Sequence, residues 1–94
     1  MQGEVTDNRE RGQFEMQVGE ALARIVYRRE GGRITLIHTE VPDALSGQGV
    51  GSRLVRGTLD RIRAEGIRVI PSCSFVAAYI ARHPEDQDLL AESV

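Results

Sequence analysis

Cysteine, aromatic residues and long apolar runs are all scarce in this chain of 94 residues. The single cysteine, Cys73, excludes an internal disulfide and a cysteine-based metal cluster, and we expect no metal site. No apolar run approaches the roughly 20 residues of a membrane span. The first residues lead into charged positions rather than into the apolar segment of a signal peptide. These absences predict a cytoplasmic protein without a membrane partner.

The chain also lacks an excess of charge of one sign. Its 12 basic and 14 acidic residues give a net charge of -2, and the two signs are interleaved along the sequence. A protein that binds nucleic acid carries a basic footprint, so we expect no nucleic-acid partner. The composition is 40% hydrophobic and 28% charged, which is typical of globular proteins, and the length predicts one domain over residues 1–94.

Alternating apolar and polar residues predict a sheet in the first half of the chain. A short edge strand at residues 2–6 and a second strand around residues 14–17 precede a longer hairpin. The two strands of this hairpin cover residues 21–28 and 33–41, and a pair of glycines supplies the tight turn between them. Pro42 ends the hairpin because it has no N–H group to donate.

The apolar period becomes helical over residues 50–65, and Gly66 is the expected end of this helix. A short strand at residues 67–70 follows. Strand, helix and strand in this order predict a right-handed crossover and a parallel pair. We expect C-terminal helices beyond residue 71, with an apolar face made of Phe75, Val76, Tyr79 and Ile80 and a further helical start at Pro84. The predicted fold class is therefore α/β (α+β), with a mixed, mostly antiparallel sheet.

Three glycines alternate immediately before the long helix, at positions 47, 49 and 51. The first amide groups of a helix have no partner within it and lie at the positive end of the helix dipole. Without side chains in the way, such a loop can close around a phosphate. The spacing matches neither a dinucleotide fingerprint nor a P-loop. The loop therefore predicts either an anion site or a flexible connection that binds nothing.

A second loop, at residues 71–74, leaves the neighbouring parallel strand and carries Cys73. Ligands of open sheets bind where parallel strands end, so we expect both loops to border one crevice. The thiol stands just before a helix N-terminus, which lowers the pKa of a cysteine. Cys73 is therefore a candidate reactive group, and a small buried apolar residue is the alternative.

Polar residues at the end of the hairpin are further candidates. His38 and Glu40 share the predicted strand face of Leu36, where a histidine fits the core or its rim better than catalysis. Glu40 lies near the glycine loop and is a candidate general base if burial raises its pKa, whereas an exposed carboxylate is the alternative.

Three residues of the C-terminal helical region also have two interpretations each. Tyr79 fits the apolar core, although its hydroxyl needs a partner. Arg82 and His83 place positive charge where the end of a helix favours it, or they meet phosphates.

Several segments, in the right order, resemble the small, single-domain GNAT-like acetyltransferases, which are roughly half-length relatives of the GNAT superfamily of N-acetyltransferases. These segments are HTEVP at 38–42, GQGVGS at 47–52, VIPSCSFV at 69–76, YI at 79–80 and HPE at 83–85. The match runs from about Phe14 to Leu90. The resemblance implies a GNAT-like fold and acetyl-CoA as the cosubstrate.

By this resemblance, the glycine loop is similar to the superfamily's pyrophosphate loop. The amides implied to hold the pyrophosphate belong to Gln48, Gly49, Val50, Gly51 and Ser52. Thr39 to Val41 would pair with the pantetheine arm as an extra strand does, and the Val41 N–H would face the thioester oxygen. The motif usually opens on Arg or Gln where this chain has Ser46, which leaves fewer positive charges near the phosphates.

The resemblance implies an N-acetyltransferase acting on an amine of a protein, a peptide or a small molecule, either directly or through Cys73. Glu40 would take the proton of the amine, and Tyr79 or Cys73 would return one to the thiolate of CoA. The Val41 amide would stabilise the developing oxyanion. The alternative is a module that binds CoA or acetyl-CoA with little or no catalysis, because the chain is short; a plain structural protein is a third interpretation. We expect a monomer or a weak homodimer.

Overall fold

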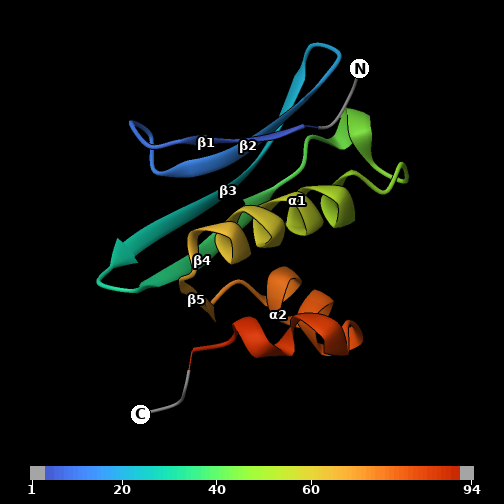
Figure 1. The fold of residues 1–94 in the computed structure, drawn as a ribbon. Helices are drawn as coiled ribbons and strands as arrows, with labels where there is room; N and C mark the ends of the chain where they lie inside the picture. Colours follow the sequence, from blue (N-terminus) through green and yellow to red (C-terminus); the bar gives the residue numbers. More distant parts are fainter. Residues whose placement is uncertain (1–3, 92–94) are drawn as a thin grey trace.

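The computed structural model describes residues 4–91, whose strands form one five-stranded sheet in the order β1-β2-β3-β4-β5 (Figure 1). The elements are β1 (Val5–Asn8), β2 (Gln13–Val18), β3 (Ala21–Glu30), β4 (Arg33–Glu40), the 3-10 helix η1 (Asp43–Leu45), α1 (Val50–Glu65), β5 (Arg68–Pro71), α2 (Ser74–Arg82) and the 3-10 helix η2 (Pro84–Leu89). The predicted edge strand at residues 2–6 overlaps β1 only at positions 5 and 6, and its positions 2 and 3 lie outside the described residues.

The sheet is mixed and mostly antiparallel. Neighbours from β1 to β4 pair antiparallel, whereas β4 and β5 pair parallel and are connected through α1. The long helix has the predicted bounds, residues 50–65, and ends on Gly66 in the left-handed conformation. The predicted fold class is confirmed. None of the described helices is long and apolar enough to cross a membrane.

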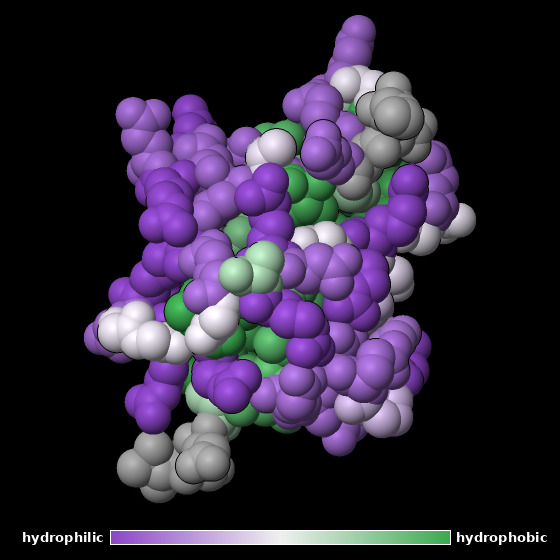
Figure 2. Space-filling model, viewed as in Figure 1, coloured by the Kyte–Doolittle hydropathy of each residue, from purple (hydrophilic) through white to green (hydrophobic). Residues whose placement is uncertain are grey.

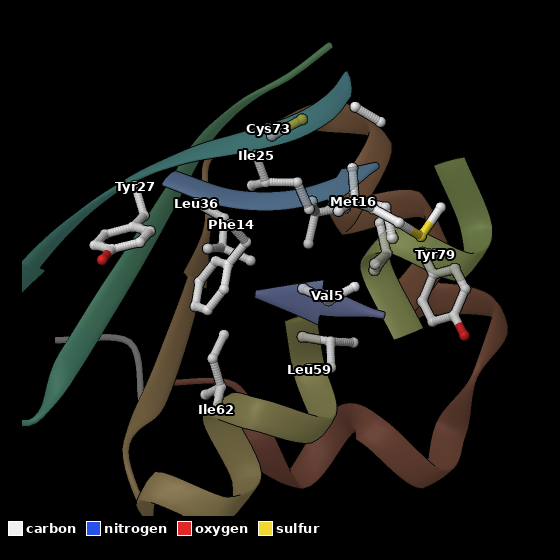
Figure 3. Packing of buried hydrophobic residues seen from close by; sticks show 14 of the residues in the cluster. Val5, Phe14, Met16, Ile25, Tyr27, Leu36, Leu59, Ile62, Cys73 and Tyr79 are labelled. Carbon is white, nitrogen blue, oxygen red and sulfur yellow. The ribbon is translucent and has the colours of Figure 1, made fainter. Parts of the chain in front are cut away.

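The core lies between the sheet and the two helices. Phe14, Ile25 and Leu36 project from three adjacent strands and are fully buried against Leu59 and Ile62 of α1 (Figure 3). Burial of each such side chain contributes roughly 1.5–3 kcal/mol to folding. Figure 2 shows mainly hydrophilic side chains over the outside of the helices, with apolar ones visible in the seams between elements. On the sheet face without helices the side chains are more exposed to solvent, and Leu22, Ile37 and Ile70 are 37–44% exposed.

A β-bulge in β4 reverses the faces of the strand halfway along it. Leu36 pairs with Tyr27 and His38 pairs with Val26, so Ile37 is one residue in excess of the regular ladder. Because the side-chain period of a strand is two, an extra residue moves every following side chain to the other face. The expectation that His38 and Glu40 lie on the face of Leu36 is therefore wrong.

Beyond the bulge, Thr39 takes the inward face instead. It pairs with Ile25, which is fully buried on the helix side, whereas Glu40 pairs with Arg24 on the open side. The bulge therefore brings a hydroxyl, in place of an imidazole and a carboxylate, to the side where α2 begins.

Gly57 allows β1 to pack directly on α1. A Cβ atom built at Gly57 would overlap the side chain of Val5. The glycine weakens the helix by about 1 kcal/mol relative to alanine, and the close packing of β1 is what it allows.

The C-terminal segment is attached to α1 through a buried carboxylate. Asp86 of η2 is 1% exposed and accepts two hydrogen bonds from Arg56, at 2.7 and 2.9 Å. The Arg56 guanidinium lowers the pKa of Asp86 below its ordinary value. The predicted helical start at Pro84 is thus a 3-10 helix held by this pair.

Candidate functional site

The glycine loop enters α1 through two positions that only glycine adopts easily. Gly47 has a φ of 77° and Gly49, the N-cap of α1, has a φ of 71°. No side chain caps the helix, and its first turn contains no acidic residue. The first amides of α1 are therefore available to an anion in front of the helix.

Gly51 is required for a different reason, which is contact with an aromatic ring. A Cβ atom at this position would lie 2.8 Å from Cζ of Phe75. The ring of Phe75 belongs to α2, so this contact sets the distance between the glycine loop and the second helix. The three alternating glycines therefore serve two functions: two shape the backbone and one admits a ring.

A pocket of about 440 Å³ opens between the end of β4, the glycine loop and α2. It is lined by Thr39, Val41, Leu45, Ser46, Gly47, Gly49, Val50, Gly51, Ser52 and Phe75. Gln48 is not among the lining residues, and its side-chain amide instead lies 3.4 Å from the Ala44 carbonyl oxygen. The pocket thus joins the end of β4 to the glycine loop, whereas none of residues 71–74 of the second loop is among its lining residues.

Among residues 4–91, no strand pairs with the second half of β4 on the edge that faces this pocket. The parallel register with β5 ends at Leu36 and Pro71, and the Cys73 amide then donates to the Leu36 carbonyl at 2.9 Å. Beyond that point β4 continues to Glu40, while the segment that follows β5 turns into α2. The two parallel strands therefore separate at the pocket.

Cys73 lies at this separation and contacts Thr39. Its sulfur is 3.1 Å from the Thr39 hydroxyl, and the residue is 9% exposed at the N-cap of α2. Burial raises the pKa of the thiol, but the Thr39 hydroxyl and the amides of Phe75 and Val76 lower it by more, so the pKa falls below its ordinary value. A larger fraction of Cys73 is therefore in the thiolate form at neutral pH than for an ordinary cysteine.

Glu40 lies on the open face and not beside Cys73. Its side chain is 55% exposed and accepts a hydrogen bond from Arg24 at 2.9 Å, with His38 3.4 Å away. Arg24 first and His38 second lower the pKa of Glu40. The condition under which Glu40 becomes a general base, a pKa raised by burial, is therefore not met.

Tyr79, Arg82 and His83 line a second, smaller pocket of about 90 Å³ together with Ser52 and Phe75. Tyr79 is 9% exposed, as expected for a core residue, and its ring stacks on His83 with centroids 3.9 Å apart. Cys73 and Tyr79 lie at different edges of the core (Figure 3). The structure therefore places the two alternative proton donors, Tyr79 and Cys73, apart from each other.

The placement of Phe75 on the apolar face of its helix is also wrong. It was expected on the apolar face of α2, but it is 43% exposed and borders both pockets. Its spacing from Tyr79 and Arg82 is i, i+4 and i+7, which is a separate stripe from the buried pair Val76 and Ile80. Splitting the helix into these two stripes separates Phe75 from the buried pair, but the sequence does not say which stripe faces the core.

Comparison with known proteins gives the family. The family model described as GCN5-related N-acetyl-transferase matches residues 13–89. The chain belongs to this family of GCN5-related N-acetyltransferases.

Within residues 4–91, no three histidine, cysteine, aspartate or glutamate side chains are grouped to hold a metal ion.

Curated relatives and a solved structure agree with this family. Protein NATD1 of Mus musculus is 34% identical over 88 residues, which are 90% of this chain and 80% of the relative. Protein NATD1 of Gallus gallus is 34% identical over 89 residues, 92% and 81% of the two chains. A GCN5-like protein of Staphylococcus aureus, described as a candidate N-acetyltransferase and solved by NMR, superposes with a TM-score of 0.72 at 30% identity, covering 98% of this chain and 91% of its own.

The resemblance to GNAT-like acetyltransferases is thus confirmed at the level of family and fold. Members of this family generally use acetyl-CoA. The larger pocket, with the uncapped start of α1 at one end and Thr39, which contacts Cys73, at the other, is the candidate site of this family member.

Proposed function

We propose that this protein binds acetyl-CoA in the larger pocket and transfers the acetyl group to an amine. The observation that carries the proposal is the uncapped start of α1, where Gly47 and Gly49 have positive φ and no side chain fills the place of an anion. The amides from Gln48 to Ser52 would hold the pyrophosphate, as the positive end of the helix favours negative charge. Ser46 adds no positive charge there, so the backbone carries this interaction.

The pantetheine arm would lie along the unpaired half of β4. Thr39 and Val41 line the pocket on this edge, where β5 has already diverged. A flexible amide-containing arm can pair there as an added strand does. The Val41 N–H would then donate to the thioester oxygen and stabilise the charge that develops on it.

The reaction would begin at Cys73. The thiolate attacks the acetyl carbon of the thioester, the bond from that carbon to the sulfur of CoA breaks, and the sulfur of CoA leaves as a thiolate that takes up a proton. The acceptor amine then attacks the acetyl carbon on Cys73, loses a proton, and releases the thiol. Direct attack of the amine on acetyl-CoA is the other route, and Glu40 on the open face does not favour it.

A second candidate function is a module that binds CoA or acetyl-CoA with little or no turnover. The observation that favours it is the position of Glu40 and Tyr79. One lies on the open face of the sheet and the other lines a separate pocket, so neither predicted proton-transfer group borders the larger pocket. Measured turnover with candidate amines would identify the acceptor, whether it is a protein, a peptide or a small amine.

We further propose that the protein acts in the cytoplasm as a single domain, alone or as a weak homodimer. A thiol whose pKa is lowered needs a reducing compartment to stay free.

Calorimetric titration with acetyl-CoA and with CoA tests the binding step. Saturable binding supports the site, and tighter binding of acetyl-CoA supports an enzyme over a CoA-binding module. Absence of binding of either molecule at moderate salt contradicts the proposal.

Mass spectrometry after incubation with acetyl-CoA tests the role of Cys73. The chain contains no lysine, so an acetyl adduct on the protein is confined to the Cys73 thiol, a histidine, a hydroxyl-bearing residue or the N-terminal amine, and peptide mapping separates these. We expect an adduct on Cys73 that Cys73→Ala abolishes together with acetyl transfer to amines. An active Cys73→Ala protein would leave the direct route.

A further inference from the structure

The smaller pocket continues the larger one on the other side of Phe75. Ser52 and Phe75 line both, so the two pockets meet at the first turn of α1. The remaining walls come from α2, whose residues Tyr79 and Arg82 follow Phe75 at helical spacing on the side facing Ser52. A molecule held at the start of α1 therefore has this pocket within its immediate reach.

The charge of the smaller pocket is positive and uncompensated. No acidic residue is among its lining residues. Within residues 4–91, neither an ion pair nor a side-chain hydrogen bond is found for Arg82, whereas Arg56 and Arg63 of the neighbouring helix both pair with carboxylates. Arg82 thus differs from these two arginines of α1, because it lines a pocket and, among the described residues, its guanidinium has no carboxylate partner.

His83 is held so that one ring nitrogen remains for a ligand. Its Nδ1 lies 2.7 Å from the Tyr79 carbonyl oxygen, where it acts as the donor, and its ring stacks on the Tyr79 ring at an interplanar angle of 11°. The second nitrogen, Nε2, is then the one that is left for contact, and it donates to an anion when the ring is in its imidazolium form. Ser52 adds a hydroxyl from the opposite wall.

We propose that this smaller pocket binds the 3′-phosphate on the ribose of CoA. The proposal rests on the proposed function, because the pyrophosphate at the start of α1 brings the 3′-phosphate to Ser52. A phosphate monoester is the next charged group along the molecule, and a guanidinium is well matched to it. A volume of about 90 Å³ admits a phosphate group but not a nucleobase. The protein then distinguishes CoA from dephospho-CoA.

Calorimetric titration of the whole chain with CoA and with dephospho-CoA tests the proposal. We expect CoA to bind about tenfold more tightly, as for charge-assisted hydrogen bonds to one group. Arg82→Gln brings this ratio close to one by weakening only CoA. His83→Asn, which keeps an amide donor near the Tyr79 carbonyl, lowers the ratio in the same direction.

Arg53→Gln is the matched control. Arg53 is exposed on α1 next to Ser52 and lines neither pocket, so its removal takes away the same charge at a similar place. We expect the ratio between the two ligands to remain as in the unmodified protein. A ratio that Arg53→Gln lowers as much as Arg82→Gln does would mean a general effect of charge and would overturn the assignment.

The outcomes separate this proposal from the function on which it rests. If both ligands bind equally tightly, the pocket does not hold the 3′-phosphate, while the CoA site stands. If neither ligand binds, both proposals fail. Competition with 3′,5′-ADP and with inorganic phosphate identifies the source of the group: stronger competition by 3′,5′-ADP supports the proposal, and equal competition assigns the pocket to free phosphate and overturns it.

Discussion

The hydroxyl of Thr39 lies 3.1 Å from the sulfur of Cys73, although 34 positions separate them in the chain. The contact exists because the bulge at Ile37 turns Thr39 toward the helices and because the Cys73 amide bonds to Leu36 on the same strand. Two independent backbone features therefore bring one hydroxyl to one thiol. The reaction that we propose at Cys73 depends on this pair.

Replacing Thr39 with valine should raise the pKa of the Cys73 thiol. The substitution keeps the shape of the side chain and removes the donor that stabilises the thiolate. The rate of alkylation by iodoacetamide, followed against pH, should fall several-fold at neutral pH, and Thr39→Ser should restore it. Thr35→Val, on the part of β4 before the bulge, is the control; an equal effect there would show that the hydroxyl contact does not tune the thiol.

Gly51→Ala should weaken binding of acetyl-CoA by about tenfold without unfolding the protein. The added methyl lies within 2.8 Å of the Phe75 ring, so the ring must move along the boundary of both pockets. Phe75→Leu in the same chain should recover part of the affinity. Gly32→Ala, where nothing lies within 4 Å, serves as control. Unchanged calorimetric affinity in Gly51→Ala would contradict a ligand path past Phe75.

Gly57→Ala should destabilise the fold by about 1 kcal/mol. Overpacking against Val5 opposes folding by roughly 1–3 kcal/mol, and the better helix propensity of alanine returns about 1 kcal/mol. Chemical denaturation measures the difference in the free energy of unfolding. In a Val5→Ala background the overlap with the γ-methyl groups disappears and only the approach to the Val5 Cβ, at 2.9 Å, remains, so the same substitution should cost less stability. A Gly57→Ala protein that is more stable with Val5 in place would refute the close packing of β1.

Asp86→Asn should lower the free energy of unfolding by about 2 kcal/mol near neutral pH, as for a lost hydrogen bond between charged groups. The folded pKa of Asp86 lies below the unfolded value of about 3.9. The pair therefore contributes its full stability above that value and loses it as the pH falls through the folded pKa. Denaturation at several pH values should show a weaker acid dependence in Asp86→Asn. Asp88→Asn, on the exposed pair with Arg63, should behave nearly as the unmodified protein does.

The sequence alone determined the order and type of the elements. Period-two alternation, helical spacing and the glycine turns gave the strands, the bounds of α1 and the crossover to a parallel strand. These are local patterns, and each follows from the geometry of one element. The glycine loop is predicted in the same way, because glycines before a helix leave its first amide groups uncovered by side chains.

Residues that depend on contacts between elements were harder to place. Phe75 was assigned to the core because helical spacing gives two adjacent stripes, and the sequence does not say which stripe meets α1. For Arg82 and His83, the sequence fits two interpretations: a positive charge at the end of a helix, or a contact with phosphates. The structure adds that both residues line the second pocket together with Ser52 of α1.

The sequence by itself therefore determined the mixed sheet, the crossover and a glycine loop in front of α1. The tertiary structure decided which side chains share the pocket. A regular alternation places His38 and Glu40 inward, but one bulged residue moves them out and moves Thr39 in. No local pattern marks that bulge, because it is fixed by the register of β4 against β3 rather than by β4 alone.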